Sequence, residues 1–304
     1  MSIPAAPSAA PVTTRRGAEP LRVAFLGTAT WLDGCCPAVA ANGLIAERVE
    51  IGPAARIESA LSATRAFKPD VTVMFVPPCI PAEALDELPG VTLGVLVGSS
   101  PSSGVSEIAS GLDRIVSFFP ALTGAAVGAA RIWRAIPPPV ADGLFGEVRP
   151  LHGRPSAMSV GRSTPHREWM LMPAKHHHDL LQVLHGVSGA SLAELLGEYD
   201  VGVHVAPDPG GGFGHQIAVH LAAGQLLLTE APTPAHGLER NIDYLHVDSP
   251  DGLAWMLDRL ARFPEMHQRI RVRGRLKAES YRASRLFARV AHDLLADVST
   301  FGRS

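Results

Sequence analysis

Two short segments made almost entirely of apolar residues constrain the fold of this chain most strongly. They are VTVMFV at residues 71–76 and TLGVLV at residues 92–97. A strand that is apolar at every position is buried on both faces, as happens in a parallel sheet covered by helices. Longer stretches with helical spacing lie between such segments, for example residues 57–67, which are followed by the stop signal KPD. The alternation predicts an α/β fold.

The same alternation runs through both halves of the chain, and a length of 304 residues is typical of two domains. In the first half, strands are expected at residues 21–26, 71–76, 91–97, 114–119 and 132–136. In the second half, they are expected at SAMSVG, QVLHGV, VGVHVA, QLLLTE and YLHVD. The segment 137–155 is dense in Pro and Gly and is interpreted as an interdomain linker. The prediction is a first domain at 21–136 and a second domain at 156–304, which ends in helices near 265–280 and 284–298.

Composition narrows the possible partners and compartments. The formal net charge is -2, whereas nucleic-acid-binding proteins usually carry a concentrated basic surface. No apolar run reaches the roughly 18 residues that a membrane-spanning helix needs. Residues 1–20 are rich in Ala and Pro without a hydrophobic signal core, which predicts a disordered leader. Three Cys, with no C-x-x-C pair, indicate a reducing compartment, and a cytoplasmic protein is expected. The adjacent Cys35 and Cys36 are interpreted as thiols without a role, with metal or redox chemistry as the alternative.

The stretch GGGFGHQIAVHLAAG, residues 210–224, is typical of a loop that leads directly into a helix. Glycines allow a ligand to approach the backbone closely, and the N–H groups at a helix start favour phosphate. The expected ligand-binding residues are Gly212, Phe213, Gly214, His215 and Gln216. His215 is a candidate to bind a sugar hydroxyl or a phosphate, and the alternative is an ordinary histidine at a helix start.

A second candidate site lies in VGRSTPHR. Gly161 and Arg162 directly follow an expected strand, and Arg167 lies five residues beyond Arg162, where a helix should begin. Two guanidinium groups beside a helix N-terminus favour an anion, because the forked donors add to the positive end of the helix dipole. The alternative is that both arginines are solvated surface groups. If they hold a diphosphate, replacing both by Ala should abolish binding and leave thermal stability nearly unchanged.

From residue 156 to its end, the sequence resembles the nucleotide-binding half of GT-B glycosyltransferases, particularly family four and its spore-maturation-type (group 1) relatives. That family carries G-R-L-x-x-x-K, whose Arg and Lys hold the donor diphosphate; GRSTPHR matches its spacing, with Arg in place of Lys. The family also carries E-G-F-G-x-x-x-x-E-A-x-A-x-G, and GFG at 212–214 and the A-x-G at 222–224 match it. YRASR at 281–285 fits the point where the last helix crosses back, and IPPPVADGLF resembles the interdomain segment.

The resemblance implies a GT-B fold, in which two Rossmann-like doubly wound domains face a central cleft and the C-terminal helix returns to the first domain. It implies transfer of a sugar from a nucleotide-diphosphate sugar, without metal and with retained configuration. The acceptor stays open between a glycan, a protein and a small molecule.

Both glutamates of the family's E-x7-E pair are absent, because Gly211 and Val219 occupy their positions. In the family the first contacts the sugar and the second binds the ribose, so the loss should weaken donor binding by about 1.5–3 kcal/mol. Glu230 and Glu239 are candidate replacements, and His215 and Glu239 are the catalytic candidates. A non-catalytic partner subunit or binding protein with the same fold is therefore the rival hypothesis. A GT-B epimerase is a third option, although no acid–base pair stands out for it.

Three other features could take part in binding. Gly27, in FLGTATWLDG, lies where the family's acceptor-side glycine loop is expected, and a tight turn with Trp31 packed locally is the alternative. LVGSSPSSG, residues 96–104, is a second loop that could cover an acceptor. The histidines at 176–178 resemble a metal site, but adjacent helical residues point about 100° apart and rarely share an ion. No metal site is predicted.

Overall fold

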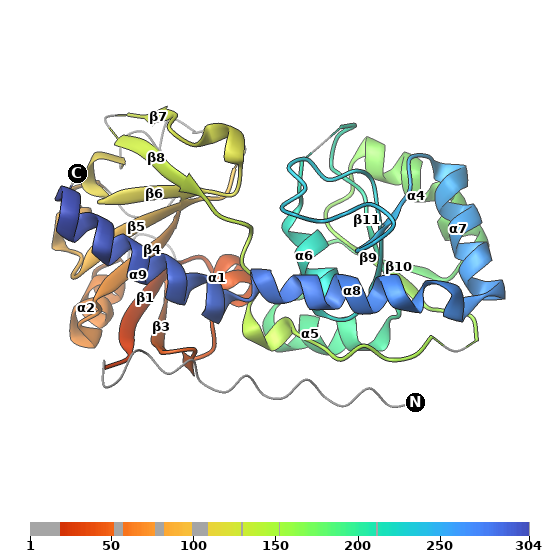
Figure 1. Ribbon diagram of the computed structural model, residues 1–304, viewed down its shortest axis with the longest axis horizontal. Helices are drawn as coiled ribbons and strands as arrows, with labels where there is room; N and C mark the ends of the chain where they lie inside the picture. Colours follow the sequence, from red (N-terminus) through yellow and green to blue (C-terminus); the bar gives the residue numbers. More distant parts are fainter. Residues whose placement is uncertain are drawn as a thin grey trace. The chain divides into compact units, whose positions relative to one another are not determined.

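The computed structural model describes residues 19–51, 57–76, 82–98, 109–128, 130–151, 153–210 and 212–303 (Figure 1). The chain forms two compact units. Unit 1 extends to Asp142 and also contains the chain from Arg282 onward, and unit 2 is Gly143–Tyr281. Each unit has its own sheet. The segment 137–155, expected as a linker, is divided between the two units, and several of its apolar side chains are buried, including Val140 and Leu151.

Unit 1 is built on an eight-stranded sheet, counted over the described residues, in the order β2-β3-β1-β4-β5-β6-β8-β7. Its strands are β1 (Leu21–Gly27), β2 (Ala40–Ala41), β3 (Leu44–Glu50), β4 (Val71–Val76), β5 (Val91–Leu96), β6 (Arg114–Ser117), β7 (Ala126–Val127) and β8 (Ala130–Ala135). The strands from β3 to β8 pair in parallel, and the two short edge strands pair antiparallel. The fully apolar segments thus form the central strands, as predicted.

Both faces of this sheet are covered. In β1, Val23 and Phe25 pack with helix α9 (Ala283–Phe301) and helix α1 (Ala29–Cys35), whereas Ala24 and Leu26 pack with α2 (Ile57–Phe67). Because successive strand residues point to opposite faces, every position of such a strand must be apolar. This double burial explains the uninterrupted apolar runs in the sequence.

The last helix of the chain belongs to unit 1, and Figure 1 shows α9 running across the strands of its sheet. Its buried residues follow helical spacing: Leu286, Phe287, Val290, Ala291 and Leu294. The ring of Phe287 meets that of Phe25 edge-on at 4.8 Å. An ion pair of 2.7 Å joins Arg114 in β6 to Asp297 in α9. These contacts hold the C-terminal helix against the first half of the chain.

Unit 2 contains a parallel five-stranded sheet among the described residues, in the order β10-β9-β11-β12-β13. Its strands are β9 (Ala157–Val160), β10 (Leu180–Val183), β11 (Val201–His204), β12 (Leu226–Thr229) and β13 (Leu245–His246). Its helices are α4 (Pro165–His177), α5 (Gly189–Glu198), α6 (His215–Ala222), α7 (Pro250–Arg262) and α8 (Gln268–Ala278). Val201 and Val203 pack with α4 and α7, whereas Gly202 faces His220 of α6, so helices cover both faces.

Short 3-10 helices lie between these elements. They are η2 (Ala82–Glu87), η3 (Ala109–Gly111), η4 (Pro120–Leu122), η5 (Asp142–Leu144), η6 (Pro264–His267) and η7 (Glu279–Tyr281). The start of α7 follows the predicted signal: Ser249 caps the helix by accepting a hydrogen bond from the Gly252 amide at 3.2 Å, and Pro250 is the first helical residue.

A buried arginine organises unit 2. Arg271 in α8 is only 2% exposed and donates from Nε to the Gly224 carbonyl at 2.6 Å and from Nη1 to the Arg149 carbonyl at 2.5 Å. Its Nη2 lies 3.8 Å from the Asp200 carboxylate. Burial lowers the pKa of Arg271 to about 10, and Asp200 opposes that shift. Arg271 therefore links three parts of the backbone: the turn after α6, the turn before β11 and the segment at Arg149.

The structure differs from the sequence prediction at several strands, and the short edge strands β2 and β7 were not predicted. β3 was not predicted, although its sequence LIAERVE pairs in parallel with β1 over seven positions. The strand expected over QVLHGV lies earlier, at Leu180–Val183, because the chain turns at Gly186, which has φ +82°. His178 follows the end of α4, and no group of three or more metal-ligating side chains occurs among the described residues. No helix in the described ranges has the length and apolar character needed to cross a membrane.

Candidate functional site

The carboxyl edge of the sheet in unit 2 gathers most of the predicted site residues. Ligands of open parallel sheets bind outside the carboxyl ends of the strands. Three neighbouring strands, β9, β11 and β12, end at this edge. Gly161 and Arg162 follow β9, the glycine-rich loop follows β11, and Glu230 follows β12. The topology therefore brings together three segments that are separated in the sequence.

Arg167 is held by the backbone at this edge. Its Nε donates to the Val205 carbonyl and its Nη1 to the Arg162 carbonyl, both at 2.8 Å. Burial lowers the pKa of Arg167, and the carboxylates of Asp208 and Glu230 oppose that shift. The side chain thus links the loops that follow β9 and β11. Replacing Arg167 would leave two carbonyls without these donors, so we expect this substitution, unlike that of Arg162, to lower stability.

A glycine suits position 161 because the Arg167 guanidinium lies against the backbone there. Its φ is +144°, and a Cβ at this residue would lie 2.5 Å from Arg167 Nη1. Arg162, the next residue, is exposed, and its guanidinium has no hydrogen-bond or ion-pair partner within the described ranges. Of the two predicted arginines, Arg162 is therefore the one whose charge is available to an anion.

The start of α4 is fixed to the loop after β11. Thr164 caps the helix by accepting a hydrogen bond from the Arg167 amide at 3.3 Å, and its hydroxyl donates to the Pro207 carbonyl at 2.7 Å. A helix N-terminus carries partial positive charge and unpaired N–H groups. The first turn of α4 and the loop before α6 therefore lie side by side at the carboxyl edge.

The glycine-rich loop is shaped by its neighbours. Gly210 has φ +70°, a conformation that favours glycine, and Gly211 lies outside the described residues. Gly214, the N-cap of α6, has φ -74°, so its backbone conformation does not require a glycine. The physical reason is steric. A Cβ at Gly214 would lie 2.3 Å from Nε2 of His204, the last residue of β11.

His204 is a buried, uncharged support beneath this loop. Its side chain is 2% exposed, and its Nδ1 lies 3.1 Å from the Thr229 hydroxyl. Burial lowers the pKa of His204 to about 3, and the nearby His220 and Arg167 lower it further. Nε2 of His204 is buried without a hydrogen-bond partner among the described residues. The sequence offered no signal for this contact, because His204 looks like any other strand residue.

The predicted loop residues have different roles. The ring of Phe213 is buried and meets the ring of His236 edge-on at 4.8 Å, and its amide donates to the Thr233 carbonyl at 3.0 Å. Phe213 therefore anchors the loop through both its ring and its amide. His215 and Gln216 form the first turn of α6 and are half-buried, and Gly212 precedes Phe213 in the same loop.

Val219 stands at the position of the second family glutamate and is 4% exposed within α6. It therefore offers no hydrogen-bond acceptor to a ligand. His220, the next residue, packs against the sheet, and its Nδ1 lies 2.5 Å from Gln225 Oε1. Burial lowers the pKa of His220 to about 4.

A histidine–carboxylate pair lies at the same edge. Nε2 of His166 is 2.9 Å from Glu230 Oε1, and Glu230 Oε2 accepts a hydrogen bond from the Ala206 amide at 2.8 Å. The His166 and Glu230 side chains are 10% and 21% exposed. Glu230 was a candidate in the sequence, whereas His166 was not. Two residues 64 positions apart share no local pattern, so only the fold reveals the pair.

Two predicted residues lie apart from this group. Glu239 is exposed in a turn where its amide donates to Asp243 Oδ2 at 3.0 Å, and no contact among the described residues joins its side chain to the carboxyl-edge group. Gly27 belongs to unit 1, where it is buried in β1. A Cβ there would lie 3.2 Å from the ring of Phe75, and Trp31 stacks on that ring at 6.2 Å. Close packing accounts for Gly27. Residues 99–104 of the expected second loop lie outside the described residues.

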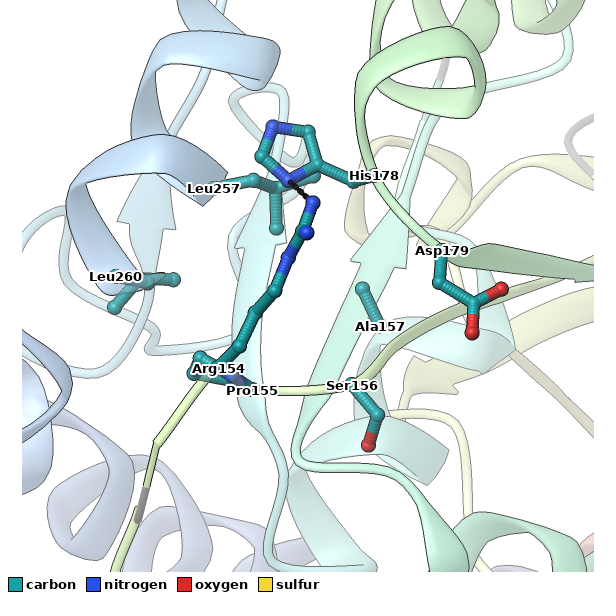
Figure 2. Close-up of a pocket in the computed structure, with 8 residues that line it drawn as sticks. All are labelled: Arg154, Pro155, Ser156, Ala157, His178, Asp179, Leu257 and Leu260. Carbon is teal, nitrogen blue, oxygen red and sulfur yellow. Dashed lines mark hydrogen bonds between the residues drawn. The ribbon is translucent and has the colours of Figure 1, made fainter. Parts of the chain in front are cut away.

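A cavity of about 140 Å³ lies elsewhere in unit 2, at the start of β9 rather than at its carboxyl end (Figure 2). Figure 2 shows Arg154 extending toward His178, whose Nδ1 lies 3.3 Å from Arg154 Nη2. Nε2 of His178 lies 3.5 Å from Asp258 Oδ1, and burial lowers the pKa of His178. This volume has room for a few water molecules and not for a nucleotide.

The cysteines carry no sign of reactivity. Cys35 and Cys36 are fully buried in the core of unit 1, and Cys79 lies outside the described residues. Burial raises the pKa of both thiols well above the ordinary value, and the neighbouring Cys36 adds to the effect on Cys35. Because the thiolate is the reactive form, these residues behave as small apolar side chains.

Comparison with known proteins gives a fold and no sequence family. No protein-family model matches the chain, and no curated protein sequence matches it. Among solved structures, it is similar to an alpha-glucosyltransferase in complex with UDP and a 13-mer DNA, with a TM-score of 0.62 and 11% identity over 91% of this chain and 99% of that one. It is similar to Anabaena Alr3699/HepE in complex with UDP-glucose, with a TM-score of 0.56 and 10% identity over 91% and 100%.

A third similar structure is sucrose-phosphate synthase from Thermosynechococcus elongatus, with a TM-score of 0.56 and 11% identity over 91% of this chain and 99% of that one. Identities near 10% carry no information on substrate, but the coverage extends over nearly the whole of each chain. The chain shares the GT-B fold of these glycosyltransferases.

Proposed function

We propose that the protein is a glycosyltransferase that binds a nucleotide-diphosphate sugar at the carboxyl edge of the sheet in unit 2. One observation carries the proposal: the exposed Arg162 lies in the loop that leads into α4, and the loop that opens α6 is tied to the start of α4 through Thr164 and Pro207. A cation and helix N-termini at one sheet edge suit a diphosphate. Similar solved structures hold UDP and UDP-glucose, which supports this choice of ligand.

In this proposal each residue has a distinct task. Arg162 binds the diphosphate and stabilises the charge that grows on it as the glycosidic bond breaks. Arg167 keeps the loops after β9 and β11 in place through its two backbone contacts. The backbone of Gly212 and Gly214 approaches the donor, and His215 and Gln216 border it. Unit 1 is proposed to hold the acceptor.

In this proposal, Arg162 and backbone N–H groups stabilise the leaving nucleoside diphosphate, and no metal ion takes part. A diphosphate bound by a forked guanidinium gains two parallel hydrogen bonds, which a point charge cannot provide. Addition of EDTA should therefore leave the rate of nucleotide release unchanged.

A second candidate function is a donor-binding protein without catalytic activity. The buried Val219 favours it, because no acceptor replaces the ribose-binding glutamate at that position. The two functions predict the same binding of UDP and different chemistry. Only the enzyme releases free nucleotide from a nucleotide sugar.

A panel of UDP- and GDP-sugars, incubated with the protein and assayed for released nucleotide, tests the proposal. We expect release from at least one donor and a rate at least tenfold lower for Arg162→Ala. Saturable binding without release identifies the non-catalytic protein. Neither binding nor release with any donor of the panel contradicts both.

A further inference from the structure

We propose that the His166–Glu230 pair binds a vicinal diol of the donor and so replaces the carboxylates that are missing at Gly211 and Val219. The diol belongs either to the ribose or to the transferred sugar, which flank the diphosphate on its two sides. This inference rests on the proposed function of unit 2 as a nucleotide-sugar site.

The position of the pair supports this role. His166 lies in the first turn of α4, Glu230 follows β12, and the Ala206 amide that binds Glu230 follows β11. The pair thus lies at the carboxyl edge formed by the three central strands. The Glu230 carboxylate is near enough to Arg167 to act on its charge. Arg167 in turn donates to the Arg162 carbonyl, so the pair and the backbone of Arg162 lie at the same edge of the sheet.

The hydrogen-bonding capacity of the pair suits two adjacent hydroxyls. Each carboxylate oxygen of Glu230 accepts one hydrogen bond, from His166 and from Ala206, and each can accept one more. When Nε2 of His166 donates to the carboxylate, Nδ1 carries a lone pair. No partner among the described residues occupies Nδ1, and it is not among the buried unpaired atoms. The pair therefore offers acceptors to hydroxyl donors.

An aromatic surface lies beside the pair. The indole of Trp169 lies 5.9 Å from the imidazole of His166, with the two ring planes tilted by 31°, and Trp169 is 59% exposed, although a large apolar ring is usually buried. An apolar ring face next to hydroxyl acceptors matches a sugar ring, which has C–H groups on its faces and hydroxyls at its rim. His166, Trp169 and Glu230 thus form a surface of mixed polarity.

Stability alone does not account for the pair. The hydrogen bond from a neutral His166 to a partly buried carboxylate gains little net free energy, because removing the carboxylate from water offsets much of the gain. Glu168 and Lys175, on the same helix, form a more exposed pair of 2.7 Å that needs no ligand. The His166–Glu230 pair instead places a carboxylate at the sheet edge where the proposed donor binds.

Calorimetric titration of UDP and of UDP-glucose tests the inference with His166→Gln and Glu230→Gln. Loss of a charge-assisted contact should weaken binding by about ten- to a hundredfold. If the pair binds the ribose, both ligands weaken equally. If it binds the transferred sugar, UDP-glucose weakens and UDP does not. Unchanged affinity for both ligands in both variants overturns the inference.

Matched controls separate this role from a general effect of the substitutions. His177→Gln changes an exposed histidine at the other end of α4, and Glu198→Gln changes an exposed glutamate at the end of α5, next to Ser156 before β9. Both should bind as the wild type does. If Glu230→Gln fails to fold, as judged by its unfolding transition, His166→Gln decides the question. Absence of binding to the wild-type protein contradicts the proposed function itself, whereas binding that both variants retain contradicts only the role of the pair.

Discussion

Replacement of Gly214 by Ala should destabilise unit 2, because the added methyl group meets the ring of His204. The backbone at Gly214, with φ -74° and ψ 139°, is open to any residue, so the substitution has no conformational penalty. Any loss of stability must therefore come from the atoms that the added methyl group meets. The new Cβ lies 2.3 Å from His204 Nε2 and 3.1 Å from Gln216 Oε1.

The magnitude follows from how firmly His204 is held. Ordinary contacts of a methyl carbon lie near 3.5–4.0 Å, so about 1 Å of movement is required. The imidazole is 2% exposed and bound to Thr229, and it cannot move into solvent. Overpacking of a well-filled interior costs about 1–3 kcal/mol. We expect the free energy of unfolding to fall by that amount.

Denaturant unfolding of four proteins measures the effect: wild type, Gly214→Ala, His204→Ala and the double variant. In the His204→Ala background the Gly214 substitution should cost close to nothing, because the opposing ring is gone. Gly197→Ala in α5 is the control. No atom lies within 4 Å of the added Cβ there, and the change should be neutral or stabilising by up to about 1 kcal/mol. The clash with His204 would be the wrong explanation if Gly214→Ala had the same free energy of unfolding as the wild type. It would also be wrong if the substitution lowered that free energy equally in both backgrounds.

Three further substitutions test the interior of unit 2. Arg271→Met removes the donor that two carbonyls and the Asp200 carboxylate share. We expect the free energy of unfolding to fall by about 3–5 kcal/mol, and an unchanged denaturation midpoint would contradict this. The folded-state pKa of His220, about 4, is below the unfolded value of about 6.5, so its contribution to stability is lost as pH falls below about 6.5 toward 4. His220→Leu should reduce this pH dependence by up to about 1.4 kcal/mol per pH unit, and an identical slope of stability between pH 6.5 and 4.5 would refute it. Val219→Glu places an unpaired carboxylate in a buried position and should destabilise the protein by about 2 kcal/mol or more; tighter UDP binding at wild-type stability would show that the ribose site is still open.

The sequence predicted the α/β architecture because burial on both faces leaves a direct record in the residue pattern. Strands such as β4 and β5 are apolar throughout, and the start of α7 carries its capping signal at Ser249-Pro250. β3 escaped prediction because LIAERVE mixes apolar and charged residues without strict alternation. Its role depends on its parallel pairing with β1, which no local pattern contains.

The site was predictable only in its local parts. The spacing of Gly161, Arg162 and the following helix was correct, and the structure places them at a carboxyl edge. Gly214 was interpreted as a place where a ligand approaches the backbone, and the structure shows a further constraint there, the contact with His204. Contacts such as these depend on residues from neighbouring strands, so they become visible only after the sheet order is known.

Arg162 allows the most direct test of the assignment of unit 2 as a nucleotide-sugar site. Its side chain is exposed, so replacing it should leave the fold intact. Calorimetric titration of UDP into the wild-type protein and into Arg162→Ala should show saturable binding to the first and binding at least tenfold weaker to the second, with unchanged unfolding transitions. Equal affinity of the two proteins, or no binding of UDP to the wild type, would contradict the assignment of unit 2 as a nucleotide-sugar site.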